Sequence, residues 1–328
     1  MTLVIIIVIA SLIFNFINGF HDSANAIATI VVSKTLTPMQ AVLLAGCANF
    51  VGYFTFGTAV AKMVGKGVVH VDAITLHIIL ATVVGAIVWN LITWVFGIPT
   101  SSSHSLIGAL LGAGVVASGI SVIDLGGLMK IFMFIFIAPM LGMIGSVFFT
   151  TLILRLFRKS NPQKSSKLFR KLQLVSAAFY SVGHGTNDAQ KTMGIIALTL
   201  LTAGINSTFV IDGWVVLSSY LAISVGTMFG GWKIVKTMGT NITKIRQMEG
   251  FCAETAAAVV LLGTAHYGIP VSTTHVIAGS IMGVGAVEHM NKVRWITARK
   301  ILWAWIITIP VAAVFAGVCY IALSFFIS

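Results

Sequence analysis

Long apolar runs separated by short polar connections fill most of the chain. Each run is about 20 residues long, the length at which a helix crosses about 30 Å of hydrocarbon. Their continuity excludes the strands of a membrane barrel, in which apolar and polar positions alternate. The pattern predicts an all-α polytopic membrane protein with long spans at residues 2–20, 38–61, 75–96, 128–154, 213–231, 251–267 and 301–327.

Shorter apolar stretches, interrupted by glycine or polar residues, lie between these runs. We expect them to be broken or re-entrant helices, because irregular backbone at membrane depth is tolerated only where it lines a cavity or the protein interior. The composition agrees with a membrane protein, since 58% of the residues are hydrophobic and 9% are charged. The interrupted stretches are residues 21–33, 99–118, 172–203 and 270–287.

The basic residues set the orientation of the chain rather than indicating a nucleic-acid partner. Most of the 20 lysines and arginines fall into four connections, which the positive-inside rule places in the cytoplasm. This path puts both termini outside the inner or plasma membrane, with five crossings on each side of a basic linker at 159–170. The basic residues expected inside are Lys34, Arg155, Arg158, Lys159, Lys164, Lys167, Arg170, Lys171, Lys233, Lys236, Lys244, Arg246, Lys292, Arg294, Arg299 and Lys300.

Two motifs each occur twice in the chain, in the same order. GIPTSSSHSLIGALLGAG at 97–114 and GIPVSTTHVIAGSIMGVG at 268–285 are identical at eight positions. NGFHDSANAIAT at 18–29 superimposes on HGTNDAQKTMGI at 184–195. Because an odd number of crossings separates the copies, we expect inverted repeats at 1–158 and 171–328. Inverted repeats whose interrupted helices meet near the midplane are the build of secondary transporters.

Each GIP motif has the features of a helix that stops and restarts inside the membrane. The proline ends one helix, and the hydroxyl residues that follow cap the next. A helix start offers free N–H groups and a partial positive charge, so two starts that face each other can hold a tetrahedral oxyanion. Alternatively, the small residues only allow close helix packing. The candidate anion ligands here are Ser101, Ser102, Ser103, Ser272, Thr273 and Thr274.

Asp22 and Asp188 are the central candidates for holding a coupling cation. A charged side chain at the membrane centre costs about 3 kcal/mol even on the mildest scale, so it indicates function. Neighbouring amide and hydroxyl oxygens are hard ligands of the kind that a small cation takes. Either carboxyl group can instead carry a proton, because burial favours its neutral form. The candidate cation ligands are Asp22, Asn25, Ser102, Asn187, Asp188 and Thr273.

Lys191 breaks the symmetry of the second motif pair, because its repeat mate is Asn25. It can add fixed positive charge beside the anion, or it can stand in for one bound cation. The alternatives are a structural ion pair with Asp188 or a side chain that snorkels to an interface.

Five further residues are secondary candidates. Glu254 lies in the span before the second GIP motif and is either a cation or proton residue or an interfacial helix cap, while its repeat mate is apolar. The four histidines beside the motifs either orient a hydroxyl and donate to the anion or are buried with satisfied rings. These histidines are His21, His104, His184 and His275.

At these four motifs the chain resembles the inorganic phosphate transporter (PiT) family, and especially its bacterial low-affinity Pit-type members. The resemblance covers both halves and implies a homodimeric symporter of inorganic phosphate. It implies that His21 stands where many sodium-coupled members have asparagine, so Na⁺ and H⁺ both stay open as the coupling ion. It also implies that phosphate and cations contact the residues matching Asp22, Asn25, Ser101, Ser102, Ser103, Asn187, Asp188, Ser272, Thr273 and Thr274, with Lys191 beside them.

The leading hypothesis is cation-coupled phosphate symport by alternating access. A phosphate dianion alone faces a large desolvation cost in this region, so adjacent cations are required. The alternatives are a sulfate permease of the same family, a passive anion channel and an intramembrane hydrolase that uses a serine, His104 and Asp22. A hydrolase needs one unique nucleophile, whereas this chain duplicates its hydroxyls and acids. We therefore expect no enzyme and no prosthetic group.

Overall fold

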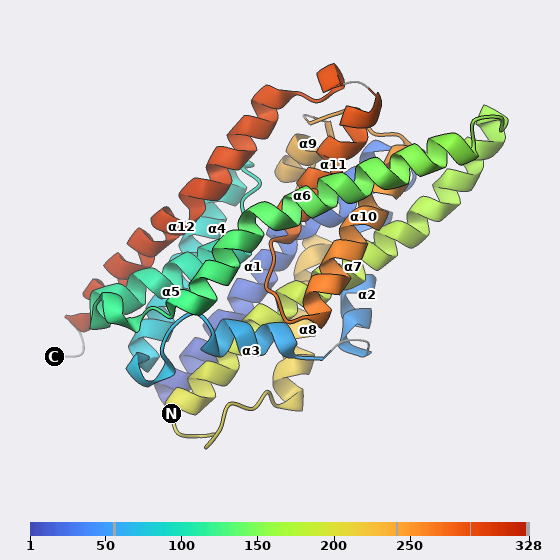
Figure 1. Ribbon diagram of the computed structural model, residues 1–328. Coiled ribbons are helices and arrows are strands. Elements are labelled where there is room, and N and C mark those ends of the chain that lie inside the picture. The colour runs from blue at the N-terminus through green and yellow to red at the C-terminus, as the bar shows by residue number, and fades with distance from the viewer. Residues whose placement is uncertain (55–56, 241, 289, 326–328) are drawn as a thin grey trace.

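Helices form nearly all of the chain that the computed structural model describes, which comprises residues 1–54, 57–240, 242–288 and 290–325 (Figure 1). The first half contains α1 (Thr2–Val32), α2 (Pro38–Val51), η1 (Gly52–Phe54), α3 (Ala59–Lys66), η2 (Val71–Ala73), α4 (Leu76–Phe96), α5 (Ser102–Ser118), η3 (Ile120–Val122) and α6 (Leu125–Leu156). The second half contains α7 (Pro162–Thr202), α8 (Gly213–Phe229), α9 (Trp232–Thr240), α10 (Gln247–His266), α11 (Thr273–Glu288), η4 (Met290–Lys292) and α12 (Trp295–Ser324).

The α-helices follow the same order in both halves. A long helix comes first (α1, α7), followed by a bent pair (α2 with α3, α8 with α9), a helix that ends at GIP (α4, α10), a short helix (α5, α11) and a long outer helix (α6, α12). Pro139 inside α6 and Pro310 inside α12 occupy matching positions. The fold class predicted from the sequence, an all-α membrane protein made of two related halves, is confirmed.

The two halves exchange packing partners. The short helix α5 packs against α12 of the other half, and α11 packs in the same way against α6. Close contact explains two glycines of the GIP motifs, because an added methyl group at Gly108 would lie 2.4 Å from the Ile309 oxygen, and one at Gly279 would lie 2.2 Å from the Pro139 oxygen. This reciprocal arrangement is what an inverted repeat produces. The central α1 contacts helices from both halves.

Among the described residues, five helices are long and apolar enough to cross a membrane, and up to seven spans result if each bent pair counts as one. The five are α1, α4, α6, α10 and α12. The helices α5 and α11 are apolar but shorter. The outer helices α6 and α12 bury only 28% and 22% of their most apolar segments, so most of that surface faces away from the protein.

Two predicted helix breaks are wrong. The stretches 21–33 and 172–203 were expected to be broken or re-entrant, but α1 and α7 run through them without interruption. Neither helix contains a proline or a positive backbone φ in these stretches. Their polar side chains find partners on neighbouring helices instead, so the backbone keeps its regular hydrogen bonds.

One bend lies inside the span predicted at 38–61, and the other lies at the end of the span predicted at 213–231, so that α9 falls outside it. The axes of α8 and α9 meet at 75°, and the helical segment Pro38–Phe54 meets α3 at 87°. Side chains beside the two acids cap the restarted helices, because Gln190 accepts from the Val60 N–H (2.9 Å) and Ser23 accepts from the Gly231 N–H (2.5 Å). Side chains of the long helices α1 and α7 therefore stabilise the bends in the neighbouring helix pairs.

The basic linker is mostly helical. Asn161 caps α7 and Pro162 occupies its first turn, so residues 162–170 form the start of that helix. With 41 residues, α7 is about 60 Å long, more than a bilayer requires. The division of the chain into 1–158, 159–170 and 171–328 stays a prediction, and α7 begins inside the segment expected to link the repeats.

Candidate functional site

Both GIP motifs form tight connections between two helices. Gly97 and Gly268 end α4 and α10 with φ values of 67° and 68°, a left-handed conformation that glycine adopts without strain. Ser101 Oγ accepts from the His104 N–H (3.2 Å), and Ser272 Oγ accepts from the His275 N–H (3.3 Å). The serines therefore cap α5 and α11, as predicted, and each keeps its hydroxyl proton for another acceptor.

The starts of α5 and α11 face each other across the two halves. The Thr274 hydroxyl donates to the Thr100 carbonyl oxygen (3.2 Å), and Ser103 Oγ lies 3.5 Å from the Val271 carbonyl oxygen. These two contacts are repeat mates of one another. The N–H groups and dipoles of both helix starts therefore converge on one buried region, which suits a negative charge.

The long helices α1 and α7 bring one carboxylate to each helix start. The Ser102 hydroxyl donates to Asp22 Oδ2 (3.2 Å), and the Thr273 hydroxyl donates to Asp188 Oδ2 (3.4 Å). Both acids are buried, and ligand atoms of Asp22, Asp188 and His184 lie within 4.8 Å of one another. Two mutually repulsive carboxylates this close together require positive charge or a proton nearby.

Lys191 supplies one positive charge. Its buried ammonium donates to Asp188 Oδ1, to Ser103 Oγ and to the Val271 carbonyl oxygen (3.1 Å). A lysine that snorkels to an interface would be exposed at its end, whereas the Lys191 side chain is buried, so the snorkelling alternative is wrong. Lys191 forms an ion pair inside the site.

The two asparagines of the motifs each have a buried amide oxygen without a partner among the described residues. Asn25 Nδ2 donates to the Thr274 hydroxyl (2.8 Å), and Asn187 Nδ2 donates to the carbonyl oxygens of Gly183 (3.0 Å) and Leu261 (2.9 Å). Both Oδ1 atoms are buried and find no hydrogen-bond donor among the described residues. A buried, unpaired amide oxygen is unfavourable unless a cation or donor completes it.

Two of the four histidines contact the acids. His21 Nδ1 lies 2.9 Å from Asp22 Oδ1 and its Nε2 lies 3.1 Å from the Thr93 hydroxyl. His184 Nε2 lies 3.3 Å from Asp188 Oδ2, while its Nδ1 donates to Asn49 Oδ1 (3.2 Å). The His21 ring therefore helps to hold the Asp22 carboxylate, whereas His184 Nε2 lies near Asp188 but forms no hydrogen bond among the described residues.

The other two histidines pack on one another. The His104 and His275 ring centroids are 4.6 Å apart, and the His275 ring stacks on Trp305 with a centroid distance of 3.6 Å. Their backbone N–H groups, rather than their rings, contact the capping serines. The geometry favours a packing role for this pair.

Glu254 lies in a separate buried cluster. Its carboxylate accepts from the hydroxyls of Thr29 (2.6 Å) and Ser176 (2.5 Å) and from the Gln173 amide (3.0 Å). The alternative of an interfacial cap is wrong, because Glu249 accepts from the Arg246 N–H (3.1 Å) at the start of α10. Thr29 is one helical turn beyond Asn25 on α1, so the cluster adjoins the central site.

Sequence reasoning missed several polar residues around the two clusters. Gln173 and Ser176 are three positions apart on α7, a spacing that puts them on one face and could have marked them beside the expected acid. Tyr180 follows one turn later, and its buried hydroxyl donates to the Thr273 carbonyl oxygen (3.4 Å). Nothing in the apolar pattern distinguishes this tyrosine from a core residue.

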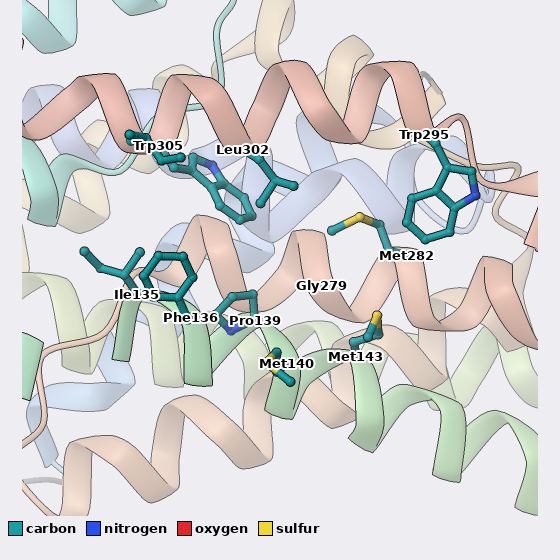
Figure 2. A pocket seen from close by; sticks show the side chains of 11 residues that line it. Ile135, Phe136, Pro139, Met140, Met143, Gly279, Met282, Trp295, Leu302 and Trp305 are labelled. Atoms are coloured by element: carbon teal, nitrogen blue, oxygen red, sulfur yellow. The ribbon is translucent and has the colours of Figure 1, made fainter. Parts of the chain in front are cut away.

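An apolar cavity of about 270 Å³ lies between α6, α11 and α12 (Figure 2). Pro139, Trp295 and Trp305 are among its lining residues, which include no charged side chain. None of the predicted ligands lines it. This cavity therefore does not suit an inorganic anion, and the buried polar region at the starts of α5 and α11 is the candidate site.

Fold and site together define a class of protein. Two related halves of membrane helices exchange partners, and their interior places two helix starts, two acids and a lysine in one buried cluster. This is the architecture of a polytopic membrane transporter.

The family follows from comparison with known proteins. The sequence profile described as "Phosphate transporter family" matches residues 18–316, and the chain belongs to that family. A probable low-affinity inorganic phosphate transporter of Rhizobium meliloti is 47% identical over 96% of this chain and 95% of its own. A Bacillus subtilis protein of the same description is 45% identical, with 98% and 97% covered.

A solved structure has the same fold. The structure described as "The sodium-dependent phosphate transporter" is similar over 99% of this chain and 100% of its own, with a TM-score of 0.91 and 26% identity. The resemblance inferred from the four motifs is confirmed at the level of the family. The relatives are described as transporters, not as enzymes.

Proposed function

We propose that this protein is a secondary transporter that carries inorganic phosphate together with Na⁺ or H⁺ by alternating access. The observation that carries the proposal is the pair of facing helix starts, each with a hydroxyl bound to a buried carboxylate. This arrangement offers donors for an anion and oxygens for a cation within one cluster. No prosthetic group takes part.

The anion binds between the starts of α5 and α11. Backbone N–H groups and hydroxyl protons there are donors, and Lys191 adds a positive charge. The phosphate ligands are the hydroxyls of Ser101, Ser102, Ser103, Ser272, Thr273 and Thr274, supported by Asp22, Asn25, Asn187 and Lys191.

The cation binds to oxygens beside the anion. Asp22 and Asp188 carry the charge that attracts it, and the unpaired oxygens of Asn25 and Asn187 complete its coordination. Ser102 and Thr273 bridge the two ligands, and Glu254, in its separate cluster, provides a position for a proton. Attraction between opposite charges in a medium of low dielectric constant couples the two ligands.

Phosphate fits this site better than sulfate for a chemical reason. A protonated phosphate can donate a hydrogen bond to Asp22 or Asp188, whereas sulfate at neutral pH has no proton to donate. The relatives described as phosphate transporters support the same substrate.

The orientation in the membrane is part of the proposal. The start of α1 and the end of α12 lie at the end of the molecule opposite the hairpin between α6 and α7 (Figure 1). Arg158, Lys159 and Lys164 are exposed at that hairpin. The positive-inside rule then puts the hairpin in the cytoplasm and both termini outside the cell membrane. A homodimer is proposed on the family resemblance, and its mass in nanodiscs tests it.

Uptake of radioactive phosphate into proteoliposomes tests the proposal. The wild type should accumulate phosphate under an inward Na⁺ or H⁺ gradient, and Asp22→Asn and Asp188→Asn should each lose at least about 90% of the initial rate, because charge neutralisation removes the cation. Asp72→Asn is the matched control, since Asp72 is exposed in η2 outside the site.

Three results would contradict the proposal in different ways. Unchanged uptake in both aspartate variants would show that the two acids do not bind the coupling cation. Flux that ignores both gradients identifies a passive channel. Sulfate that competes with phosphate at equal concentration under both gradients identifies a sulfate permease.

A further inference from the structure

The two halves of the site differ in charge at one pair of matching positions. The offset of 166 residues that superimposes Asp22 on Asp188 also superimposes Asn25 on Lys191. Asn25 and Lys191 both reach the start of the opposite short helix, where their partners Thr274 and Ser103 are themselves repeat mates. One position is therefore neutral and the other is cationic in otherwise matching surroundings.

The Lys191 ammonium is surrounded as a bound cation would be. It has three N–H donors, and its three acceptors are a carboxylate oxygen of Asp188, the hydroxyl of Ser103 and the carbonyl oxygen of Val271. Carboxylate, hydroxyl and carbonyl oxygens are also the ligands that a hard metal cation prefers. The side chain is almost fully buried, so water does not solvate its charge.

The first half presents the same three kinds of oxygen without an ammonium. They belong to Asp22, the hydroxyl of Thr274 and the carbonyl of Thr100, which are the repeat mates of the Lys191 acceptors. Neutral or shared donors contact them instead, namely His21 Nδ1 at Asp22 Oδ1 (2.9 Å), Asn25 Nδ2 at the Thr274 hydroxyl and that hydroxyl at the Thr100 oxygen. Asn25 adds a fourth oxygen, its buried Oδ1, which finds no donor among the described residues. The half that lacks the lysine therefore offers one more oxygen and one less positive charge.

From these contacts we propose that Lys191 permanently occupies the place of one coupling cation, so that the site takes a single exchangeable cation, on the Asp22 side. The inference rests on the proposed function. Asp22 and Asp188 bring two negative charges and Lys191 brings one positive charge, so one cation neutralises these three side chains before phosphate enters. A site with asparagine in both positions would need two cations, because uncompensated buried carboxylates are strongly unfavourable.

The Lys191→Asn variant tests the inference by copying Asn25 into the second half. The initial rate of phosphate uptake in wild-type proteoliposomes should rise with the coupling cation with a Hill coefficient of about 1, and in Lys191→Asn with one approaching 2. Lys130→Asn is the matched control, because Lys130 is exposed on α6 outside the site and its loss should leave the coefficient unchanged.

The reciprocal variant Asn25→Lys gives a second, independent test. It places an ammonium in both halves, and uptake should then lose its dependence on the cation. Equilibrium binding of ²²Na⁺, or proton uptake on addition of phosphate, counts cations directly on purified protein. We expect about one bound cation per protomer in the wild type and about two in Lys191→Asn. Because binding is measured directly, the count is also obtained for a variant that no longer transports.

The outcomes separate the two proposals. Wild-type protein that takes up no phosphate under either gradient overturns the proposed function. Wild-type protein that transports phosphate but binds two cations per protomer overturns the role of Lys191 alone. The same holds if Lys191→Asn gains neither a second bound cation nor a steeper cation dependence.

Discussion

At the residue scale, the site is a set of short polar contacts between repeat mates. Ser102 with Asp22 repeats as Thr273 with Asp188, and each hydroxyl stands at the start of a helix. A hydroxyl in this place can donate to the carboxylate or turn its oxygen toward a cation. Its contribution should therefore appear in the affinity for the transported ions.

Ser102→Ala and Thr273→Ala should each raise the apparent KM for phosphate by about tenfold. A hydrogen bond to a charged group contributes about 1.5–3 kcal/mol, and a loss of about 1.4 kcal/mol corresponds to a factor of ten. Uptake kinetics over a range of phosphate concentrations measure the change. Thr199→Ala is the control, because that buried hydroxyl donates only to its own helix at Ile195 (2.8 Å). Unaltered kinetics in both site variants would assign the two hydroxyls to packing.

The sequence could identify these residues only as candidates. Duplication and intramembrane charge singled out Asp22, Asp188 and Lys191, because a charge in an apolar segment is costly without a role. Tyr180 had no such signal, since a tyrosine in a long helix is compatible with many environments, and Gln173 had only its spacing from Ser176. Their roles depend on which helix lies opposite, and only packing determines that.

At the element scale, close helix contact keeps the two helix starts in register. Gly108 of α5 lies against the backbone of α12, and Gly279 of α11 lies against α6 in the same way. The Pro139 and Ile309 oxygens are too near for any side chain. The glycines therefore position the helix starts, although they touch no ligand.

Gly108→Ala and Gly279→Ala should each destabilise the protein by about 1–3 kcal/mol, because the added methyl group overpacks the contact with a backbone oxygen. A lowered melting temperature in detergent, together with slower phosphate uptake, would report the shifted helix. Gly263→Ala is the control, since no atom lies within 4 Å of its added methyl group and alanine favours a helix. Equal melting temperatures for all three variants would argue against this role.

The bent helix pairs were the elements that the apolar pattern missed. The apolar run at 38–61 looks the same whether its helix is straight or turns by 87°, and the run at 213–231 ends before α9 begins. The caps that allow the bends come from distant residues, Gln190 and Ser23. Conversely, the polar residues of α1 and α7 predicted breaks in these helices, but the helices are continuous because those side chains form hydrogen bonds with neighbouring helices.

At the scale of the whole molecule, the basic residues and the repeat together predict which ends face the cytoplasm. The hairpin between α6 and α7 lies opposite the start of α1 and the end of α12 (Figure 1). If the orientation follows the positive-inside rule, the connection after α5 lies outside and this hairpin lies inside. The two exposed serines at these places, Ser118 and Ser160, allow a direct test.

Ser160→Cys should react with a membrane-impermeant maleimide only after cells are opened, whereas Ser118→Cys should react in intact cells. Both changes are made in a variant whose native cysteines are replaced, so that labelling reports one position. Labelling is quantified by the mass shift of the protein. The reverse pattern would show that the termini lie in the cytoplasm.

The sequence by itself determined the class of the fold, the doubled motifs and the identity of the charged residues. These follow from local physics, because apolar length, helix-ending prolines and intramembrane charge have the same meaning in any fold. Only the tertiary structure decided which helices bend, which hydroxyl meets which acid and where the Lys191 ammonium lies. These contacts join residues 80 or more positions apart, and their energies depend on distance and burial, which a linear sequence does not contain.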